Sequence, residues 1–162
     1  MARRSFIVGN IVGIALATAV ATTAMAQTGS IPSGGLTFDE IIAWVKDQGY
    51  EAKISKDGAG NKMIATSANG TPFSVYPMDC KDDRCGSVQF AANWPTNGKI
   101  SAGRVADWNR EKRWARAYLS SKTLWVEADF DISPGGTYEL LNDEFDTWKS
   151  VMTAVKTYFD IK

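Results

Sequence analysis

The chain has 162 residues, of which 44% are hydrophobic and 22% are charged, a composition typical of one globular domain. Eighteen basic residues balance eighteen acidic ones, so the sequence predicts no nucleic-acid partner. Histidine is absent, which excludes Ser-His and Cys-His catalytic triads and most zinc and haem ligation, and no cofactor is expected.

The first 26 residues have the organisation of an export signal. Two arginines near the start precede an apolar stretch over residues 6–20, which is short for a membrane span and contains polar residues. It closes on Ala24-Met25-Ala26, a pattern typical of signal cleavage. We expect cleavage after Ala26, by the general secretory rather than the twin-arginine route, and a periplasmic or secreted chain without a membrane span. A retained anchor is the alternative.

Residues 27–35 are rich in Gly, Ser and Pro and are predicted to be a flexible leader to a single domain over residues 36–162. Thr37 and Glu40 form a capping-box pattern, which predicts the start of a helix. Gly49 predicts its end, because glycine readily adopts the left-handed conformation that follows a helix.

Short alternating segments with turn residues between them come next and indicate strands. Asn69-Gly70 is a strong signal for a tight hairpin turn. A second hairpin is predicted around the charged loop between Cys80 and Cys85. Because the connections are short, the pairing is expected to be antiparallel. The predicted strands cover residues 50–57, 62–68, 71–80 and 85–94.

Cys80 and Cys85 are the only cysteines of the chain. At the mouth of a hairpin their spacing suits a disulfide, and an exported domain meets oxidising conditions. Zinc would need about four ligands, and redox catalysis usually uses the C-x-x-C spacing. Calcium held by Asp79, Asp82 and Asp83 is a further alternative, although a solvated acidic turn is more common. The sequence therefore favours a structural disulfide.

The rest of the chain predicts a helix over residues 102–113 with Ser101 as its cap, two strands over residues 114–121 and 123–132, and a long last helix after Thr137. The apolar residues of the last helix recur at spacings of three and four and are Leu141, Phe145, Trp148, Met152, Val155 and Phe159. The element order, α-β(3-4)-α-β-β-α, predicts an α+β domain with helices packed on one face of an antiparallel sheet.

The last predicted strand places Glu127, Asp129 and Asp131 on one face. Two such carboxyls with perturbed pKa values could act as acid and base in a small carboxylate-dependent hydrolase. A solvated outer face, where water screens like charges, is the simpler interpretation. A non-enzymatic binding domain is therefore the preferred hypothesis, and the hydrolase is the alternative.

Candidate binding residues come from aromatic side chains and from one helix end. Asn109 and Arg113 share a helix face and are flanked by Trp108 and Trp114, which suits either a polar binding spot or, as we favour, hydrogen bonds that fix the helix end. Aromatic residues exposed together would form a patch for a protein or peptide partner. The candidates are Trp94, Asn109, Arg113, Trp114, Tyr118 and Trp125.

Two segments, Trp108–Leu119 (WNREKRWARAYL) and Tyr138–Trp148 (YELLNDEFDTW), resemble the YbjN-like family of bacterial sensory transduction regulators. The resemblance covers residues 36–159. It implies a fold like that of type III secretion chaperones and no defined biochemical activity. Within the class of binding domains, an envelope or stress-related regulator that binds a partner protein is the second hypothesis. Because type III secretion chaperones are dimers, the resemblance also makes a homodimer an expectation. The export signal and the cysteine pair depart from those cytoplasmic chaperones, so their function is not carried over.

Overall fold

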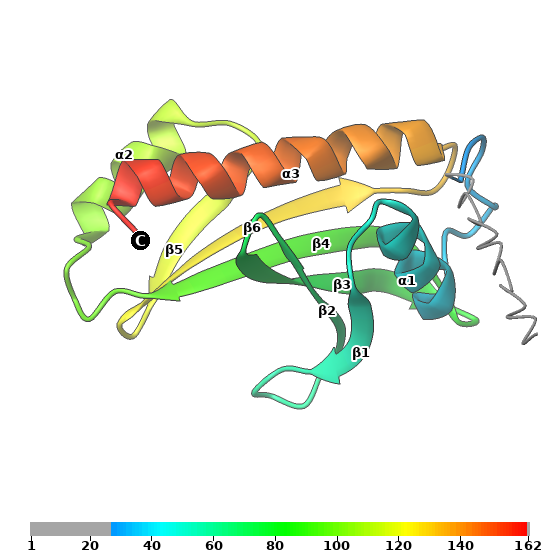
Figure 1. Cartoon of the computed structure of the whole chain (residues 1–162), viewed down its shortest axis with the longest axis horizontal. Helices are drawn as coiled ribbons and strands as arrows, with labels where there is room; N and C mark the ends of the chain where they lie inside the picture. The colour runs from blue at the N-terminus through cyan, green and yellow to red at the C-terminus, as the bar shows by residue number, and fades with distance from the viewer. Residues whose placement is uncertain (1–26, 162) are drawn as a thin grey trace, which may run out of the picture.

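The computed structural model describes residues 27–161, so the predicted export signal lies outside the described residues. Within this range, one six-stranded antiparallel sheet with the strand order β1-β2-β3-β4-β6-β5 carries helices on one of its faces (Figure 1). The fold is α+β, as the sequence predicts.

The predicted elements are all present in the predicted order, with ends that differ by a few residues. Their bounds are α1 Phe38–Asp47, β1 Ala52–Lys56, β2 Lys62–Ala68, β3 Thr71–Lys81, β4 Arg84–Pro95, α2 Ala102–Glu111, β5 Arg116–Ser120, β6 Thr123–Asp131 and α3 Tyr138–Phe159.

The helix starts and the hairpin turns have the geometry that their residues favour. Thr37 accepts a hydrogen bond from the backbone N–H of Glu40 at 3.2 Å, and the Glu40 carboxylate accepts one from the N–H of Thr37 at 2.8 Å, which completes the capping box. Asn69 and Gly70 have φ values of 51° and 73°, as a two-residue type I′ turn requires. The predicted hairpin therefore turns where expected.

Phe90, at the centre of the sheet, organises the core. Its ring centroid lies 6.2 Å from that of Phe73 on β3, 6.4 Å from Trp44 on α1, and 5.9 Å from both Phe145 and Trp148 on α3. Aromatic side chains bury large apolar areas, and stacked, tilted or edge-to-face contacts between their rings add further stability. This cluster fixes α1 and α3 on the same face of the sheet.

The helix α3 lies along the length of the sheet (Figure 1). The apolar positions predicted for its inner face are all buried, and Val151 is buried beside them. Within residues 27–161, no helix is both long enough and apolar enough to cross a membrane.

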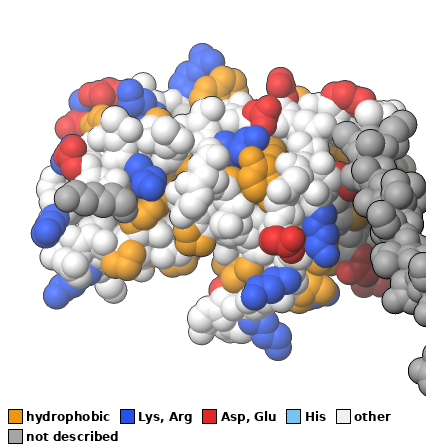
Figure 2. Space-filling model, viewed as in Figure 1, with side chains coloured by type: hydrophobic (Ala, Val, Ile, Leu, Met, Phe, Trp, Pro, Cys, Tyr) orange, Lys and Arg blue, Asp and Glu red, His pale blue; other side chains and the backbone are white. Residues whose placement is uncertain are grey.

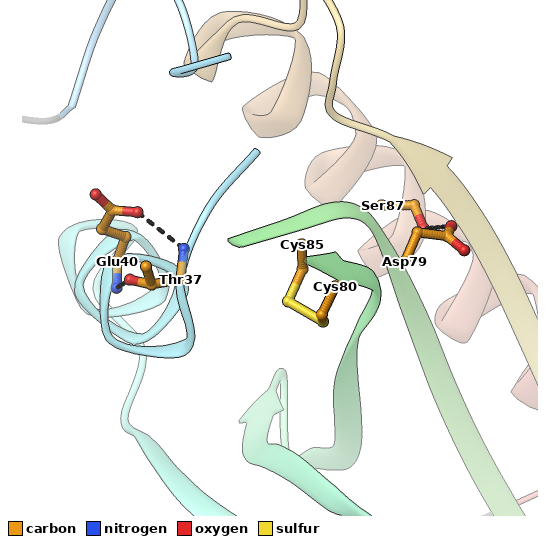
Figure 3. The surroundings of a disulfide bond; sticks show 6 residues. All are labelled: Thr37, Glu40, Asp79, Cys80, Cys85 and Ser87. Carbon is orange, nitrogen blue, oxygen red and sulfur yellow. Dashed lines mark hydrogen bonds between the residues drawn. A yellow bond between two sulfur atoms is a disulfide. The ribbon is translucent and has the colours of Figure 1, made fainter. Parts of the chain in front are cut away.

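The tip of the β3–β4 hairpin lies beside the start of α1 (Figure 3). Cys80 and Cys85 are directly opposite each other and form a disulfide, as the sequence favours. Leu36 exchanges two backbone hydrogen bonds with Cys85, at 2.8 and 3.1 Å. The Arg84 guanidinium donates to both carboxylate oxygens of Glu40, at 3.0 and 3.1 Å. The hairpin therefore anchors the start of the domain.

The segment over residues 27–35, predicted to be a flexible leader, is packed against the domain. Ile31 is only 6% exposed, and its N–H donates to the carbonyl oxygen of Gly136 at 2.9 Å. The N–H of Gly29 donates to the Glu139 carboxylate at 2.9 Å. Gly35 has a φ of 91°, and a β-carbon there would collide with the carbonyl oxygen of Cys85. The sequence predicted a flexible leader because Gly, Ser and Pro dominate the composition of this segment. A single Ile among them is a weak signal of packing against the domain.

Replacing both Cys80 and Cys85 with serine is expected to lower the free energy of unfolding by about 2 kcal/mol, because the disulfide closes only a short loop in the unfolded chain. Equilibrium unfolding in urea measures the change. A reducing agent should lower the stability of the wild type by a similar amount and leave the double variant unaffected. Free thiols found after the protein is isolated from its native cell and denatured without a reducing agent would show that the disulfide is not formed.

Candidate binding site

The sheet face opposite the helices carries a groove, here called the open-face groove, with a volume of about 670 Å³. It extends from β5 and β6 to the turn between β1 and β2, which projects away from the helices (Figure 1). Its lining residues come from five strands, β2 to β6, because alternate residues of each strand point away from the core. The side chains that matter below are Tyr76, Met78, Gln89, Tyr118, Trp125 and Glu127.

Tyr118 and Trp125 form the aromatic part of this groove. They are cross-strand neighbours on β5 and β6, with ring planes 10° apart and centroids separated by 6.4 Å. Tyr118 is 37% exposed and Trp125 is half-buried. The two rings are stacked and partly exposed, so together they offer an apolar surface that a ligand can contact. The pair is here called the aromatic platform.

Glu127 lies beneath this aromatic pair and is only 8% exposed. The Tyr118 hydroxyl donates to one carboxylate oxygen at 2.6 Å. The Arg116 guanidinium donates to the other through Nε at 3.1 Å and a terminal nitrogen at 2.7 Å. The expectation that this face of β6 is solvated is therefore wrong for Glu127, because side chains from β5 cover it. Both of its oxygens are occupied by donors.

This contact changes the acid–base behaviour of the neighbouring side chains. Burial, together with the hydrogen bond to Glu127, raises the pKa of Tyr118 to about 12. The hydrogen bond to Glu127 also raises the pKa of Arg116 above its ordinary value. Burial raises the pKa of Tyr76, on the opposite side of the groove, and the charge of Asp57 adds to the effect. Both phenols therefore remain neutral donors at physiological pH.

The turn between β1 and β2 closes one end of the groove. The Asp57 carboxylate accepts hydrogen bonds from the backbone N–H groups of Ala59 at 2.9 Å and Asn61 at 2.8 Å, and from the Asn61 side chain at 2.9 Å. An Asp that bonds the backbone ahead of it stabilises a tight turn. This end of the groove is thus held by its own hydrogen bonds.

The six predicted binding residues do not form a single patch. Tyr118 and Trp125 line the open-face groove, whereas Trp94 is on the helix side of β4, half-buried against the core. The Asn109 side-chain amide accepts from the N–H of Ala117 and donates to its carbonyl oxygen, both at 2.8 Å. Asn109 therefore joins α2 to β5, in agreement with the structural interpretation.

Arg113 and Trp114 lie at a second groove, on the helix side, with a volume of about 480 Å³. It runs between the α2–β5 connection and α3, and it is here called the α3 groove. Trp114 is 59% exposed with a φ of 76°, and the Arg113 guanidinium carbon lies 4.8 Å from its ring centroid. A positive φ is uncommon for a bulky residue, so the surrounding chain holds this indole outward.

Sequence reasoning missed Tyr76, Met78 and Gln89 as groove residues. Residues alternate between the two faces of β3, so Tyr76 and Met78 lie on the face opposite to that of the buried Phe73 and Val75. This signal was visible in the sequence. Their position in the same groove as Trp125 was not visible, because it follows from the order in which β3, β4 and β6 pair.

The described residues offer little for catalysis or metal binding. Glu127 is the single buried acidic residue within residues 27–161. Over the same range, no group of three or more acidic or cysteine side chains is placed to hold a metal ion. A pair of buried carboxyls, which the hydrolase alternative would need, is not found in this part of the chain.

The fold and the groove define a small α+β domain with a groove on the sheet face that the helices leave uncovered. Its sequence matches the family model described as "Putative bacterial sensory transduction regulator" over residues 37–160. The chain therefore belongs to the YbjN family, as the segments at Trp108–Leu119 and Tyr138–Trp148 predicted. No curated protein and no solved structure matches the chain. The predicted likeness to type III secretion chaperones thus stays a prediction.

The Tyr118 phenol is expected to titrate near pH 12, above its usual value of 10. The difference between the phenolate absorbance of the wild type and that of Tyr118→Phe isolates this transition. Because the pKa is higher in the folded state, folding stability should fall as the pH rises from about 10 to about 12, and less steeply in Tyr118→Phe. Glu127→Gln should lower the Tyr118 pKa. An ordinary value in the wild type would show that the contact does not form.

Proposed function

We propose that the chain is an exported regulatory domain that acts by binding a protein or peptide partner in the open-face groove. The observation that carries the proposal is the stacked and partly exposed Tyr118–Trp125 pair beside the buried Glu127, both of whose carboxylate oxygens accept hydrogen bonds. The family's description as a regulator supports a binding role over an enzymatic one. In the periplasm, such a domain would regulate an envelope or stress-related process.

The groove is held ready for a ligand. Tyr118 is fixed at its hydroxyl by Glu127, which is in turn held by Arg116. A platform ordered before binding loses little conformational entropy when the ligand arrives, which favours affinity. Aromatic side chains with few rotatable bonds contribute much of the contact energy at protein interfaces.

A peptide or protein segment fits the polar groups around the platform. Gln89 carries an amide and Tyr76 a hydroxyl, and both are half-buried beside the aromatic pair. Amide and hydroxyl groups can pair with the N–H and C=O groups of an extended backbone. Met78, 44% exposed, adds an adaptable apolar surface for side chains of varied shape. The ligand would therefore combine apolar side chains with backbone hydrogen bonds.

Carboxylate catalysis is less well supported. Both oxygens of Glu127 already accept hydrogen bonds, which leaves no free acid or base at the groove floor. Asp129 is exposed and accepts a hydrogen bond from Gln89 at 2.7 Å. General acid–base catalysis needs two carboxyls with separated pKa values within reach of one substrate.

Binding is expected to depend on Trp125. A peptide selected on the wild-type chain from a displayed library of random peptides serves as the probe. Adding it should shift the indole N–H NMR signal of Trp125, identified through Trp125→Phe, and leave that of Trp94 in place. Trp125→Ala should weaken binding at least tenfold, as loss of a central aromatic anchor does.

Leu140→Ala is the matched control, because Leu140 is 50% exposed on α3, on the other side of the sheet. It should bind the peptide as the wild type does. Selected peptides that shift only signals from the helix side, or that bind Trp125→Ala with full affinity, would overturn the assignment of the groove.

The start of the exported chain is expected at Gln27. The first hydrogen bond of the described segment to α3 is made by Gly29, two residues further on, so cleavage after Ala26 would leave the packed segment intact. The disulfide is compatible with an oxidising compartment. Mass spectrometry of the protein recovered from its native cell should give a chain that begins at Gln27. An intact amino terminus in the cytoplasm would contradict export.

A further inference from the structure

The α3 groove has no part in the proposed function, yet it holds the most exposed tryptophan described. Lys112, Arg113 and Trp114 form one wall, and α3 forms the other. Figure 2 shows basic, apolar and acidic side chains next to one another along the edge of the molecule where α3 lies. The surface therefore carries both signs of charge. The positions of these charges along α3 determine which partner can bind there.

The charges are separated along the helix axis. Lys112, which follows α2, lies near the carboxyl-terminal end of α3, where its Nζ is 5.8 Å from the ring centroid of Tyr158. Asp143 and Asp146 line the same groove from the amino-terminal half of α3. With a rise of 1.5 Å per residue, positions 143 and 158 are about 22 Å apart. The end near Lys112 is therefore basic, and the end near Asp143 and Asp146 is acidic, with Asp146 already paired with Lys149 at 2.6 Å.

The middle of the groove is lined by small side chains. Thr147, Ser150 and Ala154 follow one another at spacings of three and four and so share one face of α3. Ser150 and Ala154 are exposed. Small residues allow a second helix to approach closely, while Trp114 provides an apolar surface beside them.

We infer that a second copy of this chain docks in the α3 groove, with the two α3 helices antiparallel about a two-fold axis. A two-fold interface brings the same surface together from both sides, so the basic end of each copy meets the acidic end of the other. Within residues 27–161, neither Arg113 nor Asp143 has an ion-pair partner. Each is therefore available for the partner copy.

Charge balance favours a second copy over other occupants. Asp146 is already paired with Lys149 at 2.6 Å, so Lys112 and Arg113 stand against Asp143, and the groove carries both signs of charge rather than one that would attract a uniformly acidic or basic partner. A second copy satisfies both ends at once. The dimer would also direct both open-face grooves away from the contact, because those grooves are on the other side of the sheet.

Light scattering of the full chain as recovered from cells, over a micromolar concentration series, tests the assembly. The wild type should give the mass of a dimer and dissociate as salt is added, because the end contacts are ionic. Arg113→Glu and Asp143→Arg should each raise the dissociation constant at least about tenfold, since each places like charges opposite each other.

Recombining the variants identifies the contact. An equimolar mixture of Arg113→Glu and Asp143→Arg should form a mixed dimer, because each altered end then meets an opposite charge. The chain carrying both changes should dimerise with itself for the same reason. Far-ultraviolet circular dichroism checks that every variant is folded.

Lys81→Glu, a reversal of an exposed charge at the β3–β4 turn, is the matched control and should remain a dimer. A monomeric wild type would overturn the inference. So would a dimer that both single reversals leave unchanged, or single variants that fail to recombine, since the contact would then lie elsewhere. Peptide binding at Trp125 is measured separately, and neither result decides the other.

Discussion

The aromatic contacts around Phe90 are the constraint from which the other features follow. Phe90 is fully buried at the centre of the sheet and is covered by Trp44 from α1 and by Phe145 and Trp148 from α3. Rings of this size need a continuous apolar environment, so both helices must lie on the same side of β4. A sheet covered in this way presents its second face to solvent. On that face, polar and aromatic residues occupy the strand positions that alternate with the buried core residues.

The two exposed surfaces differ in what holds them in place. On the open face, Tyr118 is fixed by a hydrogen bond to Glu127 within the sheet, and Asn109 of α2 holds the backbone of the preceding residue, Ala117. On the helix side, the direction of the Trp114 side chain is set by its backbone, which has a φ of 76°. Trp114 lies between α2 and α3, and the position of these helices depends on the core. A change in helix packing would therefore disturb the α3 groove more than the open-face groove.

Local patterns were read correctly from the sequence, and arrangements across strands were not. The capping box at Thr37, the turn at Asn69 and the disulfide at Cys80 each depend on residues a few positions apart, so the printed sequence contains the whole signal. The burial of Glu127 depends on β5 lying beside β6 with Arg116 opposite it. That register comes from tertiary pairing, and an acidic residue on an alternating strand otherwise indicates a solvated position.

The position of α3 at the end of the chain affects the order of folding. The strands are synthesised first, but the side chains that cover Phe90 from above include Phe145 and Trp148, which come near the carboxyl terminus. Until those residues are available, the sheet would carry an uncovered apolar face, a state that is prone to aggregate. Completion of the core therefore waits for the residues of α3. A chain whose core closes late would be slow to reach its folded form, which is compatible with the export proposed above.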